Sequence, residues 1–153
     1  MEYIKLQKEI LTNALKDKVK FNVQTTDESV YLTDNGYQIF IFPQNEFYLD
    51  LKKLMQGKVE MKIKDMLKID GEDGHLTNEM KVLPSKTTVV KIASENNHSW
   101  VNKKLLDRYK IKQGLHFTVP KSNKIPLLVW EDEMLCGMIL PVNVKEDDDN
   151  GTI

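Results

Sequence analysis

The segment that decides the fold is IPLLVWEDEMLCGMILPV, residues 125–142. It contains two apolar runs separated by the acidic triplet 131–133, which predicts two strands joined by a turn. Pro141 ends the second run because proline cannot donate a backbone hydrogen bond inside a sheet. Just before this hairpin, the sequence predicts a helix over 98–110 and a strand over 115–119. We therefore expect the chain to end in a helix followed by three strands.

The start of the chain predicts the same order of elements. Residues 3–17 have an amphipathic helical pattern. Its apolar face is expected to consist of Tyr3, Leu6, Ile10, Leu11, Ala14 and Leu15. Strands are expected over 21–26, 29–33 and 37–42. Asn35 and Gly36 favour a tight hairpin turn between the last two strands. Two such units, with the helices on one face of antiparallel sheets, indicate the α+β class.

The helix predicted over 98–110 is short and amphipathic. Ser99 is its expected N-cap, although the third residue after it is Asn102 and not the acid of a full capping box. Its buried stripe is expected to consist of Val101, Leu105, Leu106 and Tyr109. Lys103, Lys104 and Lys110 fall outside this stripe. The lysines of both predicted helices therefore lie on polar faces, and most such faces are only solvated.

The middle of the chain, residues 44–85, has a weaker pattern and is treated as an insertion. Candidate strands lie over 47–51, 59–63 and 76–83, and the acidic stretch 70–74 is expected to be a loop. Residues 86–93 alternate clearly and predict a strand. We expect a single domain over residues 1–144 and a disordered acidic tail over residues 145–153.

The composition limits the classes of function. The 153 residues are 41% hydrophobic, which is enough for one core, and the formal net charge is −1. A general basic footprint is absent, so contact with DNA would require lysines gathered on one face. The single cysteine, Cys136, excludes an internal disulfide and fits a reducing compartment. No apolar run approaches membrane-spanning length, and we expect a cytoplasmic protein.

Catalytic and metal-binding patterns are missing. His75, His98 and His116 have no partner at metal-ligand spacing, and Cys136 lies in an apolar strand. The loop over 70–74 does not fit a calcium-binding EF-hand, because His75 occupies the position that needs glycine. We expect neither an enzyme nor a cofactor. Architecture and surface must then carry the function.

Three places resemble the DNA sliding clamps, the family of the bacterial beta clamps and of proliferating-cell nuclear antigen. They are the turn Leu32–Tyr37, the helix with Leu105-Leu106 followed by 116–119, and the strand pair 126–130 and 138–142 with its apolar-proline-apolar ending. The resemblance covers residues 3–43 and 86–144. It implies a non-enzymatic processivity or tethering factor. A stand-alone domain of this kind suits a phage or a mobile element.

The resemblance also implies two surfaces. In clamps the helices face double-stranded DNA without reading its sequence, and here this assigns Lys5, Lys8, Lys16, Lys103, Lys104 and Lys110 to DNA. Clamps bind polymerase or other replication-protein peptides near their last strand, which here assigns Leu140, Pro141 and Val142 to a partner peptide. Ordinary packing at the end of a strand is the alternative for these three. Because clamp rings contain several such domains, a homo-oligomer is expected.

A different function is compatible with the same fold. The domain could be a protein-interaction module that binds another protein through a sheet edge and does not bind DNA. An enzyme on an α+β scaffold, with a site that the sequence does not reveal, is the third reading. Salt-sensitive DNA binding would distinguish the first reading from the second.

Overall fold

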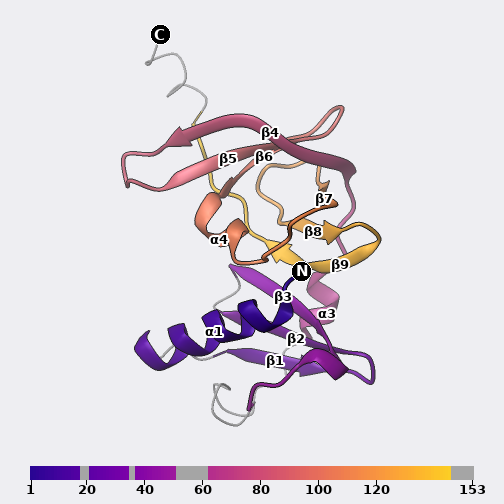
Figure 1. Cartoon of the computed structure of the whole chain (residues 1–153). Coiled ribbons are helices and arrows are strands. Elements are labelled where there is room, and N and C mark those ends of the chain that lie inside the picture. Colours follow the sequence, from indigo (N-terminus) through magenta and orange to yellow (C-terminus); the bar gives the residue numbers. More distant parts are fainter. Residues whose placement is uncertain (18–20, 35–36, 51–61, 146–153) are drawn as a thin grey trace.

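The chain folds as an α+β protein with a large open antiparallel sheet, as the computed structural model shows (Figure 1). The structure describes residues 1–17, 21–34, 37–50 and 62–145. Within these ranges, nine strands follow the order β1-β2-β3-β9-β8-β7-β4-β5-β6. Their bounds are β1 Asn22–Thr25, β2 Ser29–Asp34, β3 Gln38–Pro43, β4 Glu72–Val82, β5 Thr88–Ala93, β6 His98–Asn102, β7 Leu115–Val119, β8 Leu127–Glu131 and β9 Met134–Ile139. The α-helices of the described residues are α1 Tyr3–Asp17, α3 Ile63–Met66 and α4 Lys103–Asp107.

The N-terminal part matches the predicted elements. Helix α1 lies across β1–β3, and the three strands form a meander (Figure 1). Leu6 and Ile10 are buried against the sheet. Two assignments within the helix are wrong, because Leu11 and Leu15 are exposed. Gln7 is buried instead, so the buried face is rotated away from the predicted apolar face.

The predicted helix over 98–110 is wrong in its first five residues. Those residues form β6, which pairs with β5 from Val89↔Asn102 to Ala93↔His98. Helix α4 covers only Lys103–Asp107, and the Asn102 side chain accepts a hydrogen bond from the Lys104 amide as its N-cap. Ser99, the predicted cap, is buried within the strand. Pairing with β5 satisfies the backbone here, and this partner cannot be recognised from helical periodicity alone.

The middle segment also differs from the prediction. Residues Gln44–Glu46 form a 3₁₀ turn, and residues 47–50 are not a strand. Ile63 lies in α3, whereas residues 51–61, including most of the predicted strand over 59–63, lie outside the described residues. The acidic stretch expected to be a loop enters β4 at Glu72. The strands predicted over 76–83, 86–93 and 115–119 are confirmed, as is the final hairpin.

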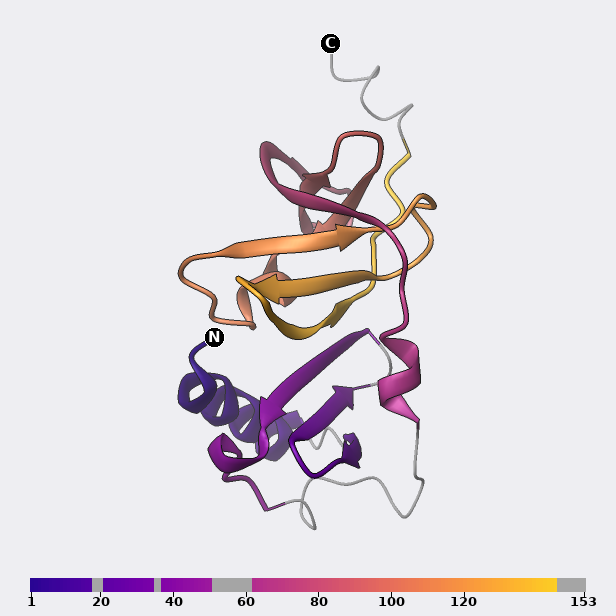
Figure 2. The same ribbon diagram turned by 90° about the vertical axis from the view of Figure 1, so that its right-hand side faces the viewer.

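The two ends of the chain are joined through β3 and β9. This contact has only three residue pairs, from Gln38↔Ile139 to Phe40↔Gly137. Tyr109 follows α4 and is fully buried beside the β3–β9 contact. Its hydroxyl group donates to the carbonyls of Ile39 and Met138. One core cluster contains residues of both parts. Figure 2 shows β3 and β9 side by side between the upper and lower strands.

The segment after β9 runs back across the molecule. The Leu140 amide donates to the Tyr37 carbonyl at 2.9 Å, and the Val142 amide donates to the Trp100 carbonyl of β6 at 2.7 Å. Val144 is buried against Val89 and Trp100. Residues 140–145 therefore attach the end of the chain to the outer side of β6. The predicted acidic tail lies, from residue 146, outside the described residues.

Candidate functional site: a basic hollow beside α4

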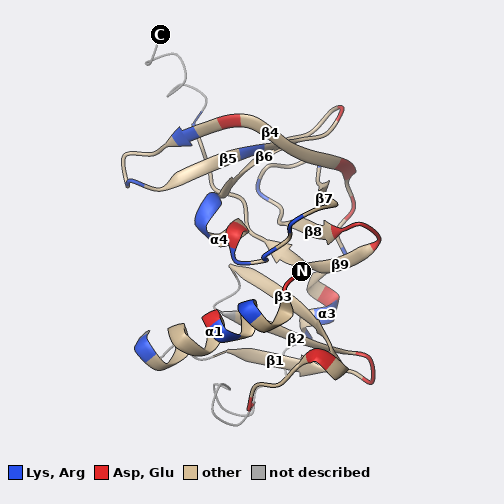
Figure 3. Cartoon of the chain, viewed as in Figure 1, with Lys and Arg blue, Asp and Glu red and all other residues tan. Residues whose placement is uncertain are grey.

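A surface hollow of about 390 Å³ gathers the lysines of α4 next to α1. We call it the basic hollow. It is lined by Glu9, Thr88, Lys103, Lys104, Asp107, Arg108 and Lys110. Figure 3 shows the basic segments of α4, of the turn after it and of the first half of α1 on the same side of the molecule. Three of the six lysines predicted to contact DNA therefore share one site.

Local structure explains how these side chains come together. The Asn102 cap starts α4 directly after β6, so Lys103 and Lys104 lie at the end of a sheet strand. Leu106 and Tyr109 are buried and fix the helix and the turn after it to the core. Lys110 has a positive φ of 54°, which reverses the chain after the helix. The reversal directs residues 108–110 toward α1.

Ion pairs within the basic hollow reduce its positive charge. The Lys110 ammonium lies 2.7 Å from the Glu9 carboxylate of α1, and the Arg108 guanidinium lies 3.8 Å from it. Lys103 pairs with Asp107 at 2.7 Å. Lys104 is exposed and makes no ion pair with a described residue. Four cationic groups thus face two carboxylates, and an incoming anion must compete with those carboxylates for three of the four cations.

The three predicted lysines of α1 lie outside the basic hollow. Lys5 pairs with Glu2 at 3.1 Å, and Lys112 reaches the same carboxylate at 3.1 Å. Hydrogen bonds from Lys5 and then Lys112 hold the pKa of Glu2 below its usual range. Lys8 lines a second hollow, and Lys16 is exposed in the last turn of α1. The Glu2 amide donates to the Lys110 carbonyl at 3.2 Å, so Lys5 and Lys112, which share the Glu2 carboxylate, lie next to the basic hollow on its N-terminal side.

The predicted peptide-binding residues contact the chain itself. The Leu140 and Val142 amides both donate to backbone carbonyls, and Val142 packs beside Val89 and Trp100. Pro141, between them, is partly buried. Part of the surface that these residues could offer a partner is thus used to hold the end of the chain against β6.

His116 is part of a polar cluster on β7. Its Nδ1 lies 2.6 Å from the Asp73 carboxylate, its Nε2 lies 2.5 Å from the Asp132 carbonyl, and its ring stacks on Trp130. Burial lowers the pKa of His116, but the contacts with Asp132 and Asp73 outweigh this and raise it overall. Both contact atoms are acceptors, so the protonated ring, which donates from both nitrogens, fits this geometry.

The other reactive side chains are placed less favourably for chemistry. Burial raises the pKa of the Cys136 thiol to about 11, which disfavours the nucleophilic thiolate. Among the described residues, no group of three or more histidine, cysteine, aspartate or glutamate side chains is arranged to hold a metal ion. The described residues also contain no helix long and apolar enough to cross a membrane.

The contact of Glu9 with Lys110 was not foreseen from the sequence, and two cations of this surface were missed. Arg108 and Lys112 belong to it although neither was predicted, and Glu9 lines the basic hollow from a helix far away in the chain. The density of basic residues over 103–112 was the available signal for the two cations. The sequence places Glu9 among the lysines on the polar face of the first helix, but its contact with Lys110 depends on the tertiary structure.

Comparisons with models of protein families, with curated proteins and with solved structures found no match to this chain.

Proposed function

We propose that the protein is a non-enzymatic cytoplasmic tethering or processivity factor that binds double-stranded DNA through the basic hollow and the surface around it. One observation carries the proposal. Lysines from α4 and the turn after it line one hollow with α1, and Lys5 and Lys112 continue the same surface. A cluster of cations on one face is what a chain with a net charge of −1 needs for this role.

The expected chemistry is contact with phosphate groups. Lysine acts as a point charge that displaces counterions from the DNA backbone, so binding would be independent of sequence and weakened by salt. Lys104, which has no carboxylate partner among the described residues, would make the least costly contact. Lys103 and Lys110 would exchange Asp107 and Glu9 for phosphate.

The proposal includes a clamp-like arrangement of the domain. A clamp-like domain places its helices toward DNA and its sheets outward, and α1 and α4 both lie beside the basic hollow. The clamp-like role also implies a homo-oligomer, because one such domain cannot surround a duplex. Light scattering over a wide concentration range tests this part separately from DNA affinity.

The test is fluorescence anisotropy with a labelled duplex at several salt concentrations. The triple variant Lys103→Glu, Lys104→Glu, Lys110→Glu should weaken binding at least about tenfold and should lower the salt slope by about one per lost contact. The control, Lys121→Glu with Lys124→Glu, changes exposed lysines outside the basic hollow. An equal loss in both variants, or no binding by the native chain, would overturn the proposal.

A second test uses Lys16→Glu alone. Lys16 is exposed at the far end of α1 and lines neither hollow. A duplex that lies along both helices should bind this variant less tightly, by about threefold for one phosphate contact. Unchanged affinity would restrict the DNA surface to the hollow and would remove the far end of α1 from it.

The second candidate is a protein-interaction module that does not bind DNA. Two observations favour it. Glu9 and Asp107 already partner three of the four cations of the basic hollow, and α1 exposes apolar side chains among its lysines. The proposed route is a sheet edge. Of the two ends of the strand order, β6 already receives the Val142 amide on its outer side, so β1 is the edge that this candidate would use. Under this candidate, the native chain shows no DNA affinity at low salt.

A further inference from the structure

The exposed side of α1 carries a regular row of side chains, which we call the α1 seam. Its members are Ile4, Lys8, Leu11 and Leu15. Ile4, Leu11 and Leu15 are 51%, 40% and 75% exposed, and Lys8 is also exposed. The steps of four, three and four residues along the row are those of the a and d positions of a helix that packs against another helix. A helix face that only meets water does not need three large aliphatic side chains at this spacing.

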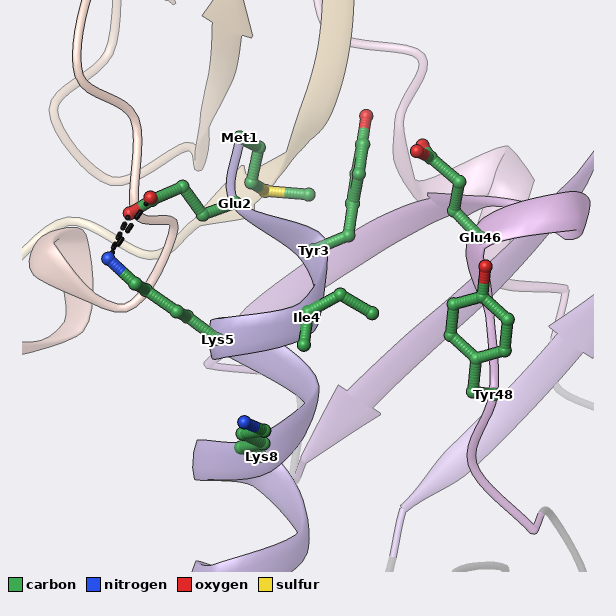
Figure 4. A pocket seen from close by; sticks show the side chains of 8 residues that line it. All are labelled: Met1, Glu2, Tyr3, Ile4, Lys5, Lys8, Glu46 and Tyr48. Atoms are coloured by element: carbon green, nitrogen blue, oxygen red, sulfur yellow. Dashed lines mark hydrogen bonds and ion pairs between the residues drawn. The ribbon is translucent and has the colours of Figure 1, made fainter.

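A hollow of about 490 Å³ lies at the N-terminal end of the α1 seam. Figure 4 shows Tyr3 and Ile4 of α1 on one side and Glu46 and Tyr48 on the other. Tyr48 is 68% exposed. The hollow therefore offers aliphatic and aromatic surface next to the first seam residue.

The Gln7 side chain holds the two walls of this hollow together. Its side-chain amide donates to the Glu46 carbonyl at 2.8 Å, and its side-chain oxygen accepts from the Tyr48 amide at 2.7 Å. Gln7 is itself buried. The segment that carries Tyr48 is thus fixed to α1 before any partner arrives, which lowers the entropy cost of binding.

The charges around the α1 seam define the partner. Lys8 lies in the seam and Lys16 beside it, and Glu9 is engaged by Lys110. Lys5 also lies beside the seam but pairs with Glu2, which Lys112 contacts as well, and Glu46 lines the hollow at the N-terminal end. A helix with acidic side chains beside its apolar row would complement these lysines. A second copy of α1 would bring lysines against lysines, which is unfavourable.

We propose that the α1 seam is a docking surface for an amphipathic helix of another protein, with apolar residues at a and d positions and acidic residues beside them. A large apolar side chain of that helix occupies the hollow between Ile4 and Tyr48. The α1 seam contributes none of the residues that line the basic hollow, although Lys5, Lys8 and Lys16 are also among the lysines assigned to DNA. It would give a tethering factor the second contact that it needs, and it does not depend on DNA binding.

The experiment uses three synthetic helical peptides with the same leucine row and with glutamate, glutamine or lysine at the flanking positions. Each labelled peptide is titrated with the full chain and followed by fluorescence anisotropy. The glutamate peptide should bind most tightly, the glutamine peptide at least about threefold more weakly, and the lysine peptide weakest of all.

Matched variants locate the binding. Leu11→Asn with Leu15→Asn should weaken the glutamate peptide at least about tenfold, because two central apolar contacts are lost. The control, Leu76→Asn with Val82→Asn, changes exposed apolar residues of β4 and should leave affinity unchanged. Circular dichroism of both variants verifies that each is folded.

Three outcomes would overturn the proposal. They are no binding of any peptide, equal binding of all three, and an equal loss in the seam and control variants. A fourth outcome, a concentration-dependent dimer that Leu11→Asn with Leu15→Asn abolishes, would also overturn it by assigning the α1 seam to a second copy of the chain. None of these results depends on DNA, so they are distinguishable from a failure of the proposed function.

Discussion

Helices α1 and α4 look equivalent in the sequence but differ in the structure. Helix α1 has 15 residues and places Leu6 and Ile10 against a three-stranded meander. Helix α4 has five residues and is held by its Asn102 cap and by the burial of Leu106 and, in the turn after it, Tyr109. The longer helix exposes apolar side chains, and the shorter one gathers lysines. An order of elements that repeats therefore does not imply surfaces that repeat.

The N-terminal and C-terminal parts of the chain meet at a small contact between β3 and β9, so the surface of one part can differ from that of the other. Only three residue pairs of β3 and β9 join their strands, supported by Tyr109 and by the Gln38 side chain, which donates to the Leu105 carbonyl. Each side has its own strand partners beyond this contact.

The largest effect is expected from Gly137→Ala. A Cβ atom at this position would lie 1.8 Å from the Ile39 carbonyl oxygen, and the φ of Gly137 is +157°. The clash falls on backbone atoms of the β3–β9 contact, so we expect a loss of about 3 kcal/mol in the free energy of unfolding. Urea denaturation measures it. A variant as stable as the native chain would mean that β3 and β9 are not paired at this position.

Tyr109→Phe should have the next largest effect. It removes the hydroxyl that donates to Ile39 and Met138 at 2.9 Å and 2.6 Å. The loss should be about 1–2 kcal/mol, because the two buried carbonyls lose a shared donor. The control is Tyr37→Phe, since Tyr37 is 58% exposed and the change should stay within about 0.5 kcal/mol. Equal losses of stability in the two variants would contradict the role of the Tyr109 hydroxyl at the β3–β9 contact.

Asn102→Ala tests where α4 begins. Loss of the side-chain acceptor for the Lys104 amide should cost about 1 kcal/mol by thermal or urea unfolding. Ser99→Ala is the matched change at the predicted cap. Its buried hydroxyl has no hydrogen-bond partner in the described part of the chain, so its removal should be neutral or slightly stabilising. A larger loss of stability in Ser99→Ala than in Asn102→Ala would instead support the helix predicted from residue 98.

The smallest effect concerns pH at His116. Its pKa is raised in the folded state, so its stabilising contribution is complete below the unfolded value of about 6.5 and is lost as the pH rises through the folded value. The Asp73 partner is exposed, so the contribution should stay below about 1 kcal/mol. His75 of β4 also faces the ring, with the two centroids 6.3 Å apart.

NMR titration of the His116 ring measures this prediction. Asp73→Asn should lower the pKa of His116 toward its ordinary value, because the carboxylate that favours the protonated ring is gone. The stability difference between the native chain and His116→Gln should be larger at pH 5 than at about pH 8. A difference that does not vary with pH would show that the ring contributes only packing.

Much of the fold could be predicted from local patterns. The helix over 3–17, the first three strands, the strand over 115–119 and the final hairpin all have clear periodicity and turn residues. The helix boundary near residue 98 could not be predicted. Helical spacing of Val101, Leu105, Leu106 and Tyr109 is real, but Val101 is buried through pairing with β5. Pairing with the neighbouring strand β5, across the turn closed by the hydrogen bond from the Ser94 amide to the Asn97 carbonyl, overrode the local helical pattern.

The candidate site was predictable only in part. The six lysines were identified from the polar faces of two helices, and three of them line one hollow. The hollow itself, the Glu9 partner and the exposed row on α1 depend on how the helices pack. An apolar residue such as Leu15 fits the periodicity whether or not another element covers it, so its exposure is not encoded in spacing alone.

The sequence by itself determined the α+β class, the long first helix and most strands, because alternation and turn chemistry act over a few residues. Tertiary structure alone decided the strand order, the short α4 and the place where basic side chains meet. These features depend on which strand edges and buried surfaces meet, both between neighbouring strands such as β5 and β6 and between strands far apart in the chain such as β3 and β9. Residues 125–142 show both effects. Their hairpin follows from the local pattern, but their pairing with β3 and their attachment to β6 come from packing.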